Sequence, residues 1–284
     1  MYEKILIGYD DSEYSRAAVK EVAAWLKRHG GKAELVHGVY SDEEEFCSKP
    51  EILGQRINDG KDACAKAGQI AADAGVTMEI KVKEGDPPQV ICSTAQEQAA
   101  DLIALGTHGR RGISRMIMGS VTAKVIAESP CDVLVVKKPC GTCSGKYEKI
   151  LVPFDSSPSS KKALETACKL AKLDQSEITV CYVIPRYEEM INFVKTESIQ
   201  KALNQEAEKI LDQARETAAA LGVTVKSEIG NGSPSENIVA TSAKEGTDLI
   251  IMGSYGWRGI NKSIIGSTAE RVIMLADMPV LVTR

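Results

Sequence analysis

A glycine pattern with phosphate-binding chemistry is the most informative feature of the sequence. Gly106, Gly109 and Gly119-Ser120 form the spacing G-x2-G-x9-G-S. The apolar run 101–105 before it predicts a buried strand, and residues 121–126 after it predict a helix. A helix that opens on Gly-Ser offers free backbone N–H groups, a hydroxyl and the positive end of its dipole. Together these groups are suited to holding a phosphate.

The same pattern occurs a second time in the chain. Gly253, Gly256 and Gly266-Ser267 again follow an apolar run and precede a helical one, and each lies 147 positions after its counterpart. Tyr-Glu-Lys-Ile-Leu also recurs letter for letter, at 2–6 and at 147–151. Two matches at one offset indicate an internal duplication. We therefore expect a domain at 1–138, a Pro-, Gly- and Ser-containing linker at 139–146, and a second domain at 147–284.

Five strands alternate with helices in each copy. In the first copy they are expected at 4–9, 33–40, 77–82, 101–105 and 132–137, and in the second at 149–154, 178–184, 223–228, 248–252 and 279–283. This alternation predicts an α/β, Rossmann-like fold, with two tandem doubly wound five-stranded parallel sheets. If the strand order is 3-2-1-4-5, strands one and four meet at the switch point, where ligands bind in such sheets.

Helix starts are marked by residues that cap or initiate helices. Ser12 is predicted to cap the helix after strand one, and Asp86-Pro87, Ser157-Pro158 and Ser233-Pro234 each predict a cap followed by a first-turn proline. A helix near 197–221 carries an apolar stripe that favours core packing, made of Ile199, Leu203, Ile210, Ala214 and Leu221.

Composition narrows the possible partners and compartments. The 284 residues carry a net charge of −4 and are 43% hydrophobic, which is typical of globular proteins and gives no reason to expect nucleic acid or an anionic membrane as a partner. The first residues enter a strand directly and do not form a signal peptide, and no apolar run reaches the roughly 18 residues of a membrane span. We therefore expect a cytoplasmic protein.

Of the eight cysteines, five bear on the interpretation. Cys92, Cys168 and Cys181 lie in apolar patterns, where a free cysteine acts as a small hydrophobic residue. Cys140 and Cys143 form a CxxC in the expected linker. No second CxxC or ligand-spaced histidine accompanies it, so an ordinary surface loop and a thiol pair or half metal site remain alternatives.

Strand-end aspartates complete the constellation, since Asp10 is followed by Ser12, and Asp155 by Ser157. With the two glycine patterns, these residues resemble the universal stress protein family over essentially the whole chain, as a tandem pair. Members that retain the glycine pattern bind ATP. The resemblance therefore implies two sites for ATP, or for ADP or an AMP-type nucleotide, with Mg²⁺ accompanying the triphosphate.

The resemblance also implies roles for individual residues. Asp10 and Asp155 would accept hydrogen bonds from ribose hydroxyls, and the backbone of Val39 or Val183 would contact the adenine edge. Gly106 and Gly253 would let the sugar and phosphates approach, and Gly109 and Gly256 would shape the turn. Phosphate oxygens would be held at the helix starts by Gly119, Ser120, Val121 and Thr122, and by Gly266, Ser267 and Thr268. His108 lies within the same loop and could reach a phosphate.

One position departs from the family pattern. Asp11 stands where the family often has glycine, and its charge could recruit Mg²⁺ or weaken the binding of bare ATP. The loop that follows Gly109 is cationic at Arg110, Arg111 and Arg115, which is favourable beside a phosphate.

The function favoured by these features is that of an ATP-binding regulatory module of the stress response. The chain has no Walker lysine pattern and no kinase signature, so no catalytic residue is predicted. The alternatives are a slow Mg²⁺-dependent ATPase that uses Asp10 or Asp11, and a thiol or metal sensor through Cys140 and Cys143. Because the family usually dimerises, we expect the two domains to pair internally as a pseudo-dimer through strands 133–136 and 280–282, and a homodimer of two chains is a further option.

Overall fold

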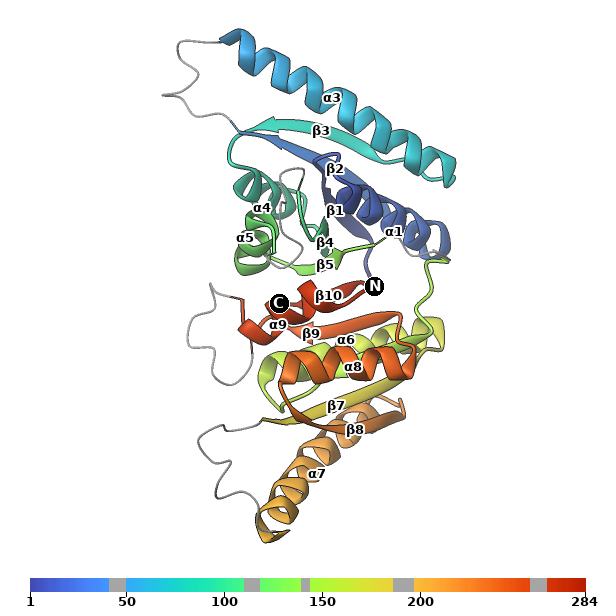
Figure 1. The fold of residues 1–284 in the computed structure, drawn as a ribbon. Helices are drawn as coiled ribbons and strands as arrows, with labels where there is room; N and C mark the ends of the chain where they lie inside the picture. Colours follow the sequence, from blue (N-terminus) through green and yellow to red (C-terminus); the bar gives the residue numbers. More distant parts are fainter. Residues whose placement is uncertain (41–49, 110–117, 139–143, 186–196, 256–264) are drawn as a thin grey trace. The chain divides into compact units, whose positions relative to one another are not determined.

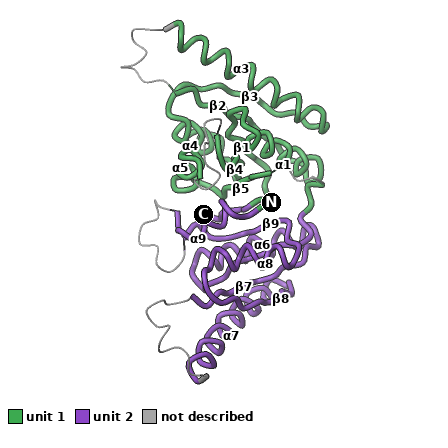
Figure 2. The backbone as a smooth tube through the Cα atoms, in the orientation of Figure 1, with its two compact units in different colours: residues 1–146, 277–279, 284 green, residues 147–276, 280–283 purple. Residues whose placement is uncertain are grey.

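The computed structural model describes residues 1–40, 50–109, 118–138, 144–185, 197–255 and 265–284. The chain forms two compact units (Figure 2). The first contains residues 1–146, 277–279 and 284, and the second contains residues 147–276 and 280–283. Cys140 and Cys143, the cationic loop after Gly109, and Gly256 lie outside the described residues.

The first unit is an open parallel sheet covered by helices (Figure 1). Its strands are β1 (Lys4–Gly8), β2 (Lys32–Val39), β3 (Glu79–Glu84), β4 (Leu102–Gly106) and β5 (Asp132–Val136). Its helices are α1 (Glu13–His29), α3 (Pro50–Asp73), α4 (Pro87–Glu97) and α5 (Ser120–Glu128). The strands pair in the order β3-β2-β1-β4-β5. Helix α1 packs with α3, and α4 packs with α5.

The second unit repeats this architecture. Its strands are β6 (Lys149–Pro153), β7 (Glu177–Pro185), β8 (Val225–Gly232), β9 (Leu249–Gly253) and β10 (Val280–Thr283). Its helices are α6 (Pro158–Asp174), α7 (Glu197–Ala220), α8 (Pro234–Glu245) and α9 (Ser267–Leu275). The order is β8-β7-β6-β9-β10, again all parallel. The predicted fold class and the predicted strand order are therefore confirmed in both units.

Buried aliphatic side chains of the central strands form the cores. Leu6, Ile7 and Ile103 are fully buried in the first unit, as are Leu151 and Leu249 in the second. Parallel sheets with helices on both faces need strands that are apolar on both sides, and the runs KILIG and LIALG meet this requirement. As a result, strands one and four of each unit are rigidly held, and their carboxyl ends can position a site.

Strand three of each unit begins two residues later than predicted. β3 begins at Glu79 rather than Thr77, and β8 at Val225 rather than Val223. The reason is the end of the preceding helix, where Gly75 has φ +80° and the Val76 N–H donates to the Ala71 carbonyl at 2.9 Å. This is a Schellman closure, so the residues after the glycine still belong to the helix end.

Two of the four predicted caps are confirmed. The Ser12 and Ser157 hydroxyls accept the N–H groups of Ser15 and Ser160, at 3.1 and 3.2 Å. Asp86 occupies the cap position of α4 without a side-chain capping bond, because its carboxylate instead pairs with Lys124 at 2.9 Å.

Ser233 precedes α8 without a side-chain capping bond either.

The apolar stripe of α7 lies at other positions than predicted. Ala214 is fully buried as expected, but the other buried positions are Ala207, Leu211 and Ala218, whereas Ile199, Leu203, Ile210 and Leu221 are half-buried.

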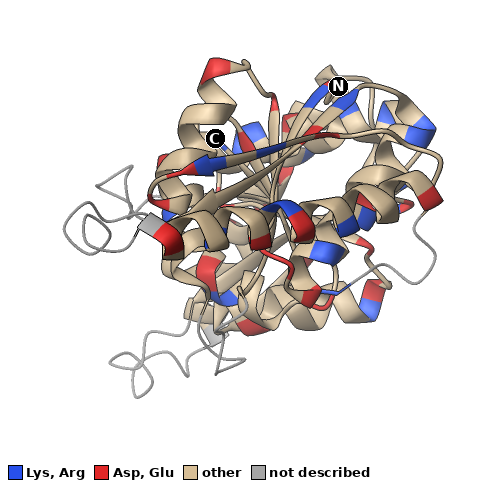
Figure 3. Cartoon of the chain, turned by 90° about the horizontal axis from the view of Figure 1, so that it is seen from above, with Lys and Arg blue, Asp and Glu red and all other residues tan. Residues whose placement is uncertain are grey.

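Charged side chains of both signs are interspersed along the helices and strands of the described chain (Figure 3). Among the described residues, no helix combines the length and the apolar composition that crossing a bilayer requires.

The two kinds of cap in the second unit allow a matched stability test. Ser157→Ala removes the hydroxyl that accepts the Ser160 N–H, and should lower the free energy of unfolding by about 1 kcal/mol. Ser233 also stands directly before a first-turn proline, but it makes no capping bond. Ser233→Ala should therefore change the free energy of unfolding by less than about 0.5 kcal/mol. Urea unfolding, with amide exchange in the first turns of α6 and α8, compares them. Equal losses in the two variants would contradict the capping assignment.

Candidate functional site

The aspartate that follows β1 and the loop that follows β4 lie against each other in the first unit. Asp10 comes two residues after the end of β1, and Gly109 three residues after the end of β4. A Cβ atom built on Gly109 would lie 2.7 Å from Asp10 Oδ2. The two segments, about 100 residues apart in sequence, therefore approach so closely that any side chain at Gly109 would collide with the carboxylate.

Ser12 ties these segments together. Its N–H donates to Asp10 Oδ1 at 3.1 Å, which fixes the aspartate at the start of α1. Its hydroxyl accepts the Ser15 N–H and donates to the His108 carbonyl at 3.2 Å. One residue thus orients the aspartate, caps the helix and anchors the β4–α5 loop.

The amino terminus of α5 opens beside the same loop. Gly119 is its cap residue and, as a glycine, makes no side-chain capping hydrogen bond. The Gly119 N–H donates to the Thr107 carbonyl at 3.0 Å, so the loop returns to the end of β4 before the helix begins. Ser120 is exposed and Val121 half-buried. The cap residue therefore brings no side-chain oxygen that would compete for the first-turn N–H groups of α5, which suits an anion site.

Thr122 plays a different part from the one expected. Its side chain is buried, and its hydroxyl donates to the Gly106 carbonyl at 2.8 Å. This bond fixes α5 to the end of β4. The Thr122 hydroxyl is therefore committed within the protein, and only its backbone N–H belongs to the helix opening.

Gly106 is required by packing inside the protein. We expected it to admit the sugar and phosphates, but a Cβ at this position would lie 2.6 Å from Tyr14 Cβ and 2.8 Å from the Ser15 nitrogen. Gly253 of the second unit faces Ser159 in the same way, with its Cβ position 2.6 Å from Ser159 Cβ. In each unit this glycine lets the first helix pack directly on the end of strand four.

The second unit repeats the geometry. Asp155 Oδ1 accepts the Ser157 N–H at 3.0 Å, and the Gly266 N–H donates to the Ser254 carbonyl at 2.8 Å. Gly266 caps α9 without a side-chain capping bond. Ser267 is exposed and Thr268 half-buried at the start of this helix. Here the Ser159 hydroxyl donates to the Tyr255 carbonyl, the bond that Ser12 makes to His108 in the first unit.

The strand-two residues need a correction in the second copy. Val39 is buried at the end of β2, and its carbonyl accepts the Gly85 N–H at 2.9 Å. The register pairs Gly8 with Val36 and Pro153 with Cys181, so both strands keep an offset of 145 between the copies. Ile184 is therefore the counterpart of Val39, and Val183 corresponds to Gly38.

Asp11 is neutralised by cations of the first unit. It has φ +62°, as does its counterpart Ser156, which explains a position that favours glycine. Its carboxylate lies 2.7 Å from Arg16, 3.7 Å from Lys66, and 3.0 Å from the Tyr9 hydroxyl, which donates to it. Burial acts to raise the Asp11 pKa, but these hydrogen bonds and charges outweigh it and lower the pKa.

The Asp11 carboxylate is thus balanced within the protein, and a divalent cation would compete with Arg16 and Lys66 for it. No group of three histidine, cysteine or acidic side chains suited to a metal ion occurs in the part of the chain that the structure describes.

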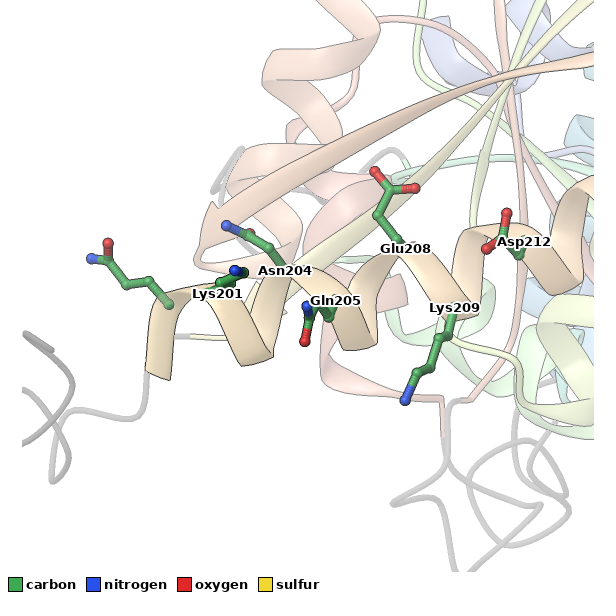
Figure 4. A pocket seen from close by; sticks show the side chains of 7 residues that line it. Lys201, Asn204, Gln205, Glu208, Lys209 and Asp212 are labelled. Carbon is green, nitrogen blue, oxygen red and sulfur yellow. The ribbon is translucent and has the colours of Figure 1, made fainter. Parts of the chain in front are cut away.

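A shallow depression on α7 is unrelated to these turns. Polar and charged residues of this one helix line it, namely Gln200, Lys201, Asn204, Gln205, Glu208, Lys209 and Asp212 (Figure 4). None of the residues predicted from the sequence contributes to it. A site built from several strand ends, as in the two turns, is the stronger candidate.

Sequence reasoning missed the hydroxyl residue after the first glycine. Thr107 and Ser254 supply the carbonyls that close the turns, and both side chains are buried. The available signal was the repeat itself, since a hydroxyl residue stands at this position in both copies.

Comparison with known proteins agrees with the duplication. The sequence model of the universal stress protein family matches residues 1–137 and again 146–284. A universal stress protein of Methanocaldococcus jannaschii is 34% identical over 145 residues, 49% of this chain and 84% of the relative. The universal stress protein YxiE of Bacillus subtilis is 32% identical over 147 residues, 49% of this chain and 99% of the relative.

A solved structure extends the likeness of fold to the whole chain. The crystal structure of a universal stress protein from Archaeoglobus fulgidus matches with a TM-score of 0.76 over 99% of this chain and 98% of that one, at 22% identity.

The packing role of Gly106 can be tested with a second glycine as control. Gly106→Ala should lower the free energy of unfolding by about 1–3 kcal/mol, because the new methyl group overlaps Tyr14. Gly54→Ala, in exposed α3 with nothing within 4 Å of the new atom, should raise it by about 0.5–1 kcal/mol. Urea unfolding of both variants measures the difference. A Gly106→Ala protein as stable as wild type would overturn this role.

Proposed function

Because the chain belongs to the universal stress protein family, we propose that it is an ATP-binding regulatory protein with one adenine-nucleotide site in each unit. The supporting observation is geometric. In both units a helix opens on Gly-Ser without a side-chain cap, and the loop before it is bonded to the turn that carries the strand-end aspartate. An anion-binding helix start beside a carboxylate that can accept from hydroxyl groups suits the phosphates and the ribose of a nucleotide.

In the proposed site, different residues bind the ribose and the phosphates. Asp10 and Asp155 accept hydrogen bonds from ribose hydroxyls. The phosphates bind to first-turn amides of α5 and α9, at Ser120–Thr122 and Ser267–Ala269. Gly109 keeps the space beside Asp10 free of side chains, since a Cβ there would lie 2.7 Å from the carboxylate. Mg²⁺ enters with the triphosphate.

The proposed activity is regulatory. Holding phosphate with main-chain amides needs no catalytic side chain, and the internal ion pairs of Asp11 favour a binding role over that of an ATPase. Nucleotide occupancy would change the docking of a partner or of a second chain. The two sequence repeats, 1–138 and 147–284, would be the two binding domains.

Binding stoichiometry tests the site assignment. Wild type should bind two adenine nucleotides per chain in titration calorimetry. Gly119→Val should bind one, because a side chain there points at the Thr107 carbonyl, 3.1 Å from the Cβ position, and disturbs the helix opening. Gly266→Val should likewise bind one, and the double variant none. Two nucleotides bound by a folded double variant would remove the assignment.

Asp10→Asn tests the same site with a substitution that should leave the fold intact. Asp10→Asn keeps the oxygen that accepts the Ser12 N–H but removes the charge facing the ribose. We expect the first site to lose about tenfold in affinity, since a hydrogen bond to a charged group contributes about 1.5–3 kcal/mol. Thermal unfolding should change little. Unaltered ATP affinity in this variant would exclude Asp10 as a ligand.

A further inference from the structure

His108 carries a buried nitrogen that the protein does not satisfy. The side chain is 7% exposed, its Nδ1 lies 3.0 Å from Thr107 Oγ1, and its Nε2 is buried with no hydrogen-bond partner. Leaving such a buried polar group unpaired is unfavourable. Among the described residues only a handful of buried side-chain atoms are in this state, and two of them, His108 Nε2 and Ser254 Oγ, lie in the two equivalent turns.

The main chain of His108 lies at the centre of the first site. Its carbonyl accepts the Ser12 hydroxyl, and its Cα lies 3.4 Å from the Cβ position of Gly119, the cap of the α5 helix. A Cβ on the next residue, Gly109, would lie 2.7 Å from Asp10 Oδ2. The backbone that carries the imidazole thus lies between the aspartate and the helix opening, and the Tyr14 ring, 5.2 Å away between centroids, restrains the imidazole.

The hydrogen bond to Thr107 decides what the unpaired nitrogen can offer. When the Thr107 hydroxyl donates to Nδ1, the neutral ring carries its proton on Nε2 and becomes a hydrogen-bond donor there. Phosphate oxygens only accept, so this tautomer matches a phosphate. The Thr107 hydroxyl thereby prepares the ring for an anion.

The second unit has no counterpart of the Thr107–His108 side-chain pair. Tyr255 stands at the position of His108, 147 residues later, and Ser254 stands at that of Thr107. Without an imidazole beside it, the buried Ser254 hydroxyl has no partner. The replacement of His108 by Tyr255 therefore accounts for the unpaired Ser254 hydroxyl. The two turns also differ in the donor that they offer, an imidazole N–H in the first and a serine hydroxyl in the second.

We propose that His108 Nε2 donates to a phosphate oxygen of the nucleotide in the first unit, and that the two sites are inequivalent for this reason. The proposal rests on the proposed function, because it assigns a specificity-determining residue to one of its two sites. The first site then distinguishes ATP from adenosine more strongly than the second site does.

Imidazole nitrogen NMR observes the contact directly. The chain has three histidines, and His108→Phe identifies the signal of interest. ATP should shift the His108 Nε2 resonance and slow the exchange of its proton, while adenosine should not, and His29 and His37 should be unaffected by either. If calorimetry shows ATP bound and the His108 signal does not move, this inference is wrong and the proposed function stands. If no nucleotide binds, both fail.

Substitutions at His108 and Tyr255 test whether the imidazole sets the preference for ATP over adenosine. With the second site disabled by Gly266→Val, adding His108→Phe should lower ATP affinity about tenfold and leave adenosine affinity unchanged. In wild type, Tyr255→His should give an imidazole signal that responds to ATP and should raise the ATP preference of the second site. Tyr255→Phe is the matched control without a donor. An unchanged ratio of ATP to adenosine affinity in His108→Phe would overturn the proposal.

Discussion

The close contact between the strand-one turn and the strand-four loop is the constraint on which the site depends. In the first unit, the side-chain bond from Ser12 to the His108 carbonyl joins these segments, and the backbone bond from Gly119 to Thr107 brings the start of α5 back to the end of β4. The glycines permit the contact, because a side chain at Gly106 or Gly109 would overlap α1 or the Asp10 carboxylate. The helix start and the aspartate are therefore fixed relative to each other before any ligand arrives, which lowers the entropic cost of binding.

Duplication has preserved this contact while its surroundings have diverged. The second unit keeps the backbone bond, the helix opening and the strand-end aspartate. It replaces Asp11 by Ser156 and so loses the ion pairs with Arg16 and Lys66, and it has Tyr255 in place of His108. Main-chain geometry is thus common to both units, and the differences lie in side chains around it.

Much of the fold followed from the sequence because its determinants are local or repeated. Alternating apolar strands and helices predicted the parallel sheets, and the positions of Gly106 and Asp10 at strand ends agreed with the observed order. The helical run expected from residue 121 begins at Ser120, and its counterpart in the second unit begins at Ser267. Strand three was misplaced because the Schellman bond after Gly75 depends on backbone conformation rather than on hydrophobic pattern.

The side-chain roles could not be predicted in the same way. The packing of Gly106 on Tyr14, the bond from Thr122 to Gly106, and the neutralisation of Asp11 by Lys66 all join residues far apart in sequence. Each depends on tertiary geometry that spacing does not report. The misassigned Val183 is different, because the offset of 145 between the first strands would have identified Ile184 from the sequence alone.

Native mass spectrometry of the purified chain in excess ATP tests the central claim most directly. Two main-chain helix openings predict two successive mass increments, each of one nucleotide on the 30.6 kDa chain, and no comparable uptake of adenosine. A chain that stays at its bare mass, or that binds adenosine as well as ATP, would contradict the account.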